Sequence, residues 1–116
     1  MSEISKMLSY WKKELNLQDW KIKAYDECSP LDMNIQDACG ENEWDEVNKC
    51  SKIRIITEKD YGKRMLPFDK ERILVHELLH IKFCLLDNSG NELQDRILHQ
   101  IVEEFAEILV KVKRGE

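Results

Sequence analysis

The sequence lacks the features that would place it in a membrane or an exported class. Its 116 residues contain no run of 18 apolar residues, the length that a membrane-spanning helix requires. Its first residues mix charges into a helical pattern and form no continuous apolar signal segment. Glycine and proline are few, with four and two residues, and 42% hydrophobic with 35% charged residues is an ordinary globular composition. We therefore expect one cytoplasmic domain over residues 1–116 without membrane association.

Paired cysteines and clustered basic residues are also missing. Cys28, Cys39, Cys50 and Cys84 form no C-x-x-C pair, which argues against a zinc ribbon or a thioredoxin-like site. Without an export signal, we expect them to be reduced and mostly buried. The net charge of −5 and the pI near 5.3 disfavour nucleic acid as a partner, because phosphate binding depends on clustered Lys and Arg.

The first half of the chain predicts a helix followed by strands. Apolar residues between Ile4 and Leu15 recur at helical spacing, with Ser2 as the N-cap. The segments "DWKIKAY" (19–25) and "SKIRIIT" (51–57) alternate as strands do. Residues 28–50 show only a weak alternation at Leu31, Met33 and Ile35, which is compatible with a short strand and a loop around Gly40. Residues 58–67 read as a polar loop.

The second half predicts two long helices. Asp69 can cap a helix over about residues 70–86, with Phe68 and Ile73 as a hydrophobic staple. The segment "DNSGN" breaks this helix, and Asn91 with Gln94 resembles a capping box for a last helix over about 92–113. The order predicts an α+β fold with an N-terminal helix. A small mixed or antiparallel sheet of two to four strands would carry the helices on one face.

The stretch "ILVHELLHIKF" (73–83) carries the functional signal. On a helix, His76 and His80 lie about 40° apart on one face, so both can reach one ion at about 2.0 to 2.1 Å. Glu77 sits next to that face, where it can act as general base on a metal-bound water. The surrounding residues are almost all apolar, and coordination would satisfy the polar ligands there. We therefore predict a zinc site, because imidazole ligands suit zinc.

A third ligand should come from the last helix. Two helices joined by a short connection run antiparallel, which places residue 99 beside His80 and residue 103 beside His76. His99 is the first choice, because it lies beside the apolar stripe of its helix whereas Glu103 is turned further toward solvent. Glu103 would then orient an imidazole, or would be the ligand itself if the helix rotates.

Other ligand sets are less favoured. The continuation H-E-x-x-H-x-x-G-x-x-H is excluded, because Phe83 and Leu86 occupy the Gly and last His positions. Asp87 lies near the histidine face but at the helix end. Cys84 could close a structural four-ligand site, although a cysteine in this position is more often a core residue.

The motif resembles those of known metallopeptidases. H-E-x-x-H followed after 18 residues by a third ligand is similar to the spacing in gluzincins. The order of strand "KIRIIT", loop, "ILVHELLH" helix and final helix is similar to small SprT-like and phage-encoded or bacterial metallopeptidases of the zincin fold, over roughly residues 50–113. Gluzincins have Glu where this chain has His99, and SprT-like proteins use a third His at another spacing.

The resemblance implies a zinc peptidase that hydrolyses a peptide or protein substrate with Glu77 as general base. It also implies an edge strand above the active helix for the substrate, for which "SKIRIIT" is a candidate. Tyr61 and Trp44 are candidate oxyanion stabilisers, although each is more typical of packing.

Non-catalytic functions remain open at the level of sequence. The histidines could be partly exposed polar residues, or the zinc could stabilise a protein-interaction module without turnover. An inactive domain that senses metal or a protein partner is a further alternative. The sequence identifies neither the substrate nor the oligomeric state, and a protein partner could present the substrate.

Overall fold

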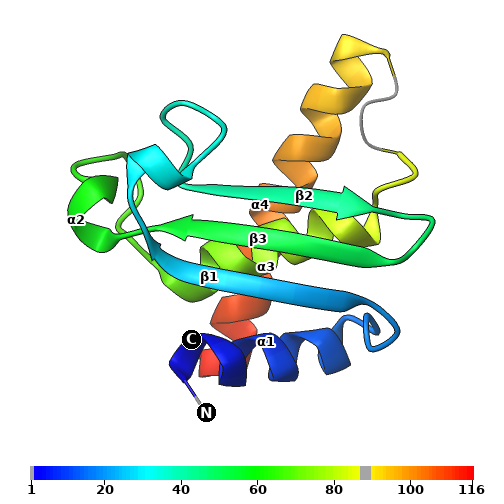
Figure 1. Cartoon of the computed structure of the whole chain (residues 1–116), viewed down its shortest axis with the longest axis horizontal. Helices are drawn as coiled ribbons and strands as arrows, with labels where there is room; N and C mark the ends of the chain where they lie inside the picture. The colour runs from blue at the N-terminus through cyan, green and yellow to red at the C-terminus, as the bar shows by residue number, and fades with distance from the viewer. Residues whose placement is uncertain (1, 87–89) are drawn as a thin grey trace.

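The fold is α+β, as predicted. The computed structural model describes residues 2–86 and 90–116. In chain order the elements are α1 (Glu3–Glu14), β1 (Lys21–Cys28), the 3-10 helix η1 (Pro30–Asp32), β2 (Gly40–Asp45), β3 (Cys50–Ile56), α2 (Glu58–Tyr61), α3 (Lys70–Lys82) and α4 (Glu92–Arg114). Figure 1 shows the sheet as one layer with α3 and α4 behind it, and α1 along the β1 side. Among the described residues, none of the helices combines the length and apolarity needed to cross a membrane.

The sheet is mixed and has the strand order β1-β3-β2. β3 pairs in parallel with β1 and antiparallel with β2. The expectation that "SKIRIIT" forms an edge strand is therefore wrong, because β3 is the central strand. Its side chains Ile53 and Ile55 are fully buried, as suits a strand with a neighbour on each side. The edge strand that packs on α3 is β2.

β2 begins later than the sequence pattern indicated. The weak alternation at Leu31 to Ile35 does not form a strand, and Leu31 is 97% exposed. The strand is instead the polar segment Gly40–Asp45, in which Gly40 pairs with Ile55 and Asp45 with Cys50. A strand of this composition has no hydrophobic alternation, so its cross-strand partners determine its position.

The predicted helix starts are confirmed. The side chains of Ser2, Asp69 and Asn91 each accept a hydrogen bond from the backbone N–H three residues later. α3 ends at Lys82 rather than near Leu86, because the chain turns tighter there and Cys84 N donates to Ile81 O. The predicted loop 58–67 also contains the single-turn helix α2, which Thr57 caps.

α3 is the central element of the core. Six of its apolar side chains are buried, namely Ile73, Leu74, Val75, Leu78, Leu79 and Ile81. α4 buries Leu98, Val102, Ala106 and Val110 on the face that packs on α3. The four cysteines are free thiols, with Cys28 buried and the other three half-buried.

The buried carboxylate of Glu71 joins α1, α3 and α4 at the start of α3. Glu71 on α3 accepts hydrogen bonds from Trp11 Nε1 of α1 at 2.8 Å and from Lys113 and Arg114 of α4. These contacts link the starting turn of α3 to the last turn of α4. The antiparallel alignment of α3 and α4 is therefore fixed by charge as well as by apolar packing.

Candidate metal centre

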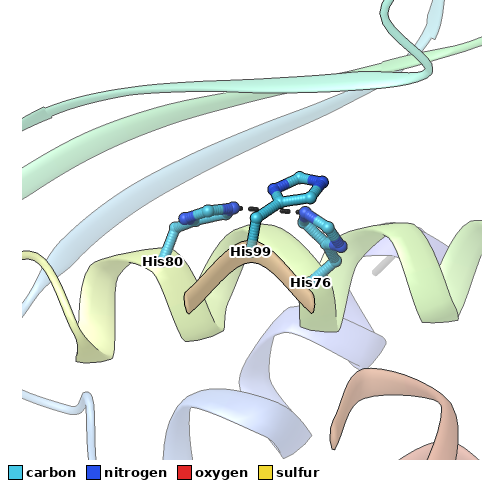
Figure 2. Close-up of side chains that lie close together, drawn as sticks. All are labelled: His76, His80 and His99. Carbon is cyan, nitrogen blue, oxygen red and sulfur yellow. Dashed lines mark hydrogen bonds between the residues drawn. The ribbon is translucent and has the colours of Figure 1, made fainter. Parts of the chain in front are cut away.

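The three histidines of the chain converge on one point. α3 contributes His76 and His80, and α4 contributes His99. One ligand atom of each lies within 4.8 Å of those of the other two. The ring centroids are separated by 4.9, 5.0 and 5.7 Å. Figure 2 shows the rings of His76 and His80 rising from α3 with the ring of His99 between them.

The spacing of the two α3 nitrogens suits a shared metal ion. Nε2 of His76 and Nε2 of His80 are 3.2 Å apart. Two nitrogens bound to one zinc ion at about 2.0 to 2.1 Å with tetrahedral angles would be separated by about 3.3 Å. Within the described part of the chain, these three histidines are the one group of His, Cys, Asp or Glu side chains whose ligand atoms all lie within 4.8 Å of one another. The cluster could hold a metal ion.

Glu103 orients His76 from α4. Its Oε2 atom is 2.6 Å from Nδ1 of His76, and its Oε1 atom accepts a hydrogen bond from Arg72 at 2.7 Å. The hydrogen bond with His76, and then the charges of His76 and Arg72, lower the pKa of Glu103 below its usual value. The ionised carboxylate accepts the Nδ1 proton, so a neutral His76 ring carries its lone pair on Nε2, toward His80.

The predicted exposures of the two α4 candidates are reversed. His99 is exposed and Glu103 is half-buried. The reason is the ion pair with Arg72, which together with His76 holds Glu103 at the interface of α3 and α4. The prediction that residue 103 lies beside His76 is confirmed. His99 lies near both α3 histidines.

Glu77 occupies the sheet side of the cluster. The residue is only 7% exposed, and its backbone carbonyl accepts a hydrogen bond from Asn42 Nδ2 of β2 at 2.9 Å. β2 approaches α3 closely at Gly40, where an added Cβ atom would lie 2.6 Å from Cγ2 of Ile73 and 3.2 Å from Oε2 of Glu77. Glycine at this position lets the edge strand come near the carboxylate.

A cavity of about 550 Å³ lies over these groups. Its lining includes the three histidines, Glu77, Glu103 and Arg72, together with β2 residues Gly40, Glu41, Asn42 and Trp44. This volume lies within the usual range of ligand pockets, about 300 to 1,000 Å³. The histidine cluster and the β2 edge therefore share one open site.

Of the weaker candidates, Cys84 and Tyr61 do not reach the cluster. The thiol of Cys84 points to Glu46, with Sγ 3.8 Å from Oε2, so it does not provide a fourth ligand. Tyr61 is buried and donates its hydroxyl to Leu66 O at 2.7 Å, and it does not line the cavity. Trp44 does line the cavity. Asp87 lies outside the described residues.

The sequence did not point to Arg72 or to the β2 residues Gly40, Glu41 and Asn42 as parts of the site. Arg72 carries a usable signal, because it lies one turn before His76 on the same face of α3 and can reach the acids of a neighbouring helix. The β2 residues carry none, because the position of β2 was not recognised.

Comparisons of the chain with protein families, with curated proteins and with solved structures found no match. Functional conclusions for this protein therefore depend on the residues of the site.

Proposed function

We propose that the protein is a zinc-dependent peptidase that uses the histidine cluster as its metal centre. The observation that carries the proposal is the convergence of His76, His80 and His99 beside the buried carboxylate of Glu77. The resemblance of the H-E-x-x-H helix to the helices of zincin peptidases supports the same conclusion.

The donor set fits zinc in a catalytic site. Catalytic zinc sites have three protein ligands and one position left for water or substrate, whereas structural sites are closed by four protein ligands. Three imidazoles supply three donors here, and Cys84 is engaged elsewhere. A zinc ion held by these residues supplies Lewis-acid chemistry, which activates water and polarises a carbonyl group.

Glu77 has the position of a general base. Its side chain lines the cavity next to the histidines and is shielded from bulk solvent. In peptide hydrolysis it would take the proton of the attacking water and deliver it to the leaving amine. Within the described chain β2 has no second strand partner, so its outer edge can pair with the main chain of an extended substrate.

The test separates metal binding from turnover. Glu77→Gln should keep one zinc per chain and lose hydrolysis of denatured protein and of a fluorogenic peptide library. Glu104→Gln, the same chemical change at an exposed position of α4, is the matched control and should keep both properties. Zinc content is measured by mass spectrometry of the purified protein, and cleavage is followed by fluorescence.

Two results would overturn the proposal. Zinc-loaded wild-type protein that cleaves none of these substrates would make the domain a non-catalytic zinc-binding module. Hydrolysis by Glu77→Gln at the wild-type rate would show that another group acts as base. Removal of the metal with a chelator and reloading with zinc should abolish and restore the activity.

A further inference from the structure

α4 carries a second apolar face that the described chain does not cover. Its six members are Leu93, Ile97, Ile101, Phe105, Ile108 and Val112, and they are 37% to 70% exposed. They are spaced three or four residues apart, so they form one stripe about 28 Å long. We call this stripe the outer face of α4.

The outer face points in a different direction from the face that packs on α3. The buried residues of α4 are Leu98, Val102, Ala106 and Val110, whose centre lies about 130° around the helix from that of the outer face, and the two faces meet where Phe105 lies beside Leu98. In the view of Figure 1, the N-terminal part of α4 also extends beyond the sheet. A helix that is apolar on two sides is normally covered on two sides. An apolar stripe of this length marks an interaction surface, because monomeric proteins rarely expose one.

We propose that a second copy of this chain covers the outer face, with the two α4 helices packed antiparallel about a two-fold axis at Ile101. In this arrangement Ile101 of one copy meets Ile101 of the other. Ile97 of each copy then packs beside Phe105 of the other, since both are four residues from the axis. The result is an isologous interface, in which the same six residues of each copy form the two contacting surfaces.

The charges beside the stripe favour the antiparallel orientation. Arg96 and Glu107 lie along the same border of the outer face, five residues before and six residues after Ile101. An antiparallel pair therefore places Arg96 of one copy near Glu107 of the other, twice. A parallel pair about a two-fold axis along the helices would place this border on opposite sides of the interface in the two copies, so Arg96 and Glu107 could not face each other.

The ends of α4 add to the same preference. Antiparallel packing opposes the two helix dipoles, which favours this orientation. The basic side chains of the last turn do not contribute, because Lys113 and Arg114 pair with acids of the first turn of α3 and its cap, and Lys111 pairs with Glu107. Two outer faces that meet would bury on the order of 1,000 Å², the lower limit of a specific interface.

The proposed interface leaves both metal centres open. His99 lies about half a turn of the helix away from the centre of the outer face. Dimerisation and zinc binding are therefore independent properties, and the proposal does not rest on peptidase activity. A variant that breaks the dimer should still bind one zinc per chain.

Sedimentation over about 1 to 500 μM protein tests the proposal, because an interface of this size associates weakly. Wild type should approach twice the chain mass of 13.8 kDa at high concentration. Ile101→Glu, which opposes two carboxylates at the axis, should remain monomeric with unchanged helicity and zinc content. Val47→Glu, a similar change at an exposed residue outside α4, should dimerise as wild type does.

Charge exchange tests the orientation. Arg96→Glu and Glu107→Arg should each weaken the dimer by roughly three- to tenfold, and the double variant should recover most of the loss. Recovery is expected only if the two residues face each other across the axis. A monomeric wild type, a dimer that is insensitive to Ile101→Glu, or a double variant weaker than both single variants would overturn the proposal.

Discussion

Nδ1 of His76 and Oε2 of Glu103 are 2.6 Å apart across the interface of α3 and α4. Arg72 holds the other oxygen of the same carboxylate at 2.7 Å. This series of hydrogen bonds runs from Arg72 of α3 to Glu103 of α4 and back to His76 of α3. Its physical effect is to fix the ring of His76 with Nε2 directed toward His80.

Glu103→Gln should lower the zinc affinity by about 10- to 100-fold, the usual effect of changing a group that orients a metal ligand. The amide can donate to Nδ1 of His76 and so favours the tautomer that lacks a lone pair on Nε2. Competition titration against a chelating indicator measures the affinity, with Glu104→Gln as the control. An unchanged affinity would show that the hydrogen bond is not needed for metal binding.

His99→Ala should lose stoichiometric zinc, whereas Glu103→Ala should keep one zinc per chain with weaker affinity. His99 contributes a ligand atom to the cluster, while both oxygens of Glu103 are engaged with α3. Metal analysis after dialysis distinguishes the two variants. The reverse result would make Glu103 the third ligand.

Arg72→Met should lower the free energy of unfolding by about 1 to 3 kcal/mol. Arg72 is buried, so its loss leaves the Glu103 carboxylate with one partner fewer, although water can reach part of that side chain. Urea denaturation of the zinc-free protein gives the change. Arg72→Lys, which restores a charge without the planar guanidinium, should recover part of the lost free energy of unfolding. Equal stability of Arg72→Met and wild type would show that Arg72 does not stabilise the Glu103 carboxylate.

Gly40→Ala should destabilise the fold by about 1 to 3 kcal/mol, because the new methyl group would collide with Ile73 and crowd Glu77. The cost should fall when Ile73→Ala removes the colliding group. Urea denaturation of the two single variants and the double variant forms a thermodynamic cycle. Additive costs would show that β2 can move away from α3 freely.

Stability should decrease at acid pH through Glu71. Burial alone would raise the pKa of Glu71, but hydrogen bonds from Lys113, Trp11 and Arg114 outweigh it and lower the pKa. A lowered folded-state pKa stabilises the protein above the usual pKa of glutamate, about 4.3, and this stabilisation is lost as the pH falls through the folded-state value.

Glu71→Gln tests this pH dependence. The variant should be less stable at neutral pH by about 1 to 3 kcal/mol and should lose less stability between about pH 5 and 3. Urea midpoints across that range measure both effects. Parallel pH curves for the variant and wild type would assign the acid sensitivity to other carboxylates, such as Asp69, whose pKa is also lowered.

Local sequence rules were sufficient for the starts of the three long helices and for part of the site. The caps at Ser2, Asp69 and Asn91 depend on residues within one turn, so they could be located without the fold. The juxtaposition of residue 103 with His76 followed from a short connection between antiparallel helices. The exposures of His99 and Glu103 could not be obtained in this way, because they depend on Arg72.

The sequence by itself determined that His76 and His80 face one point with Glu77 beside them, because helical geometry acts over a single turn. Only the tertiary structure decided which strand borders the cavity. β2 is polar and short, so its pairing with β3 and its close approach at Gly40 come from contacts with residues far along the chain. Such contacts leave no periodic trace in the segment itself, whereas a helix shows its buried face in the spacing of its own residues.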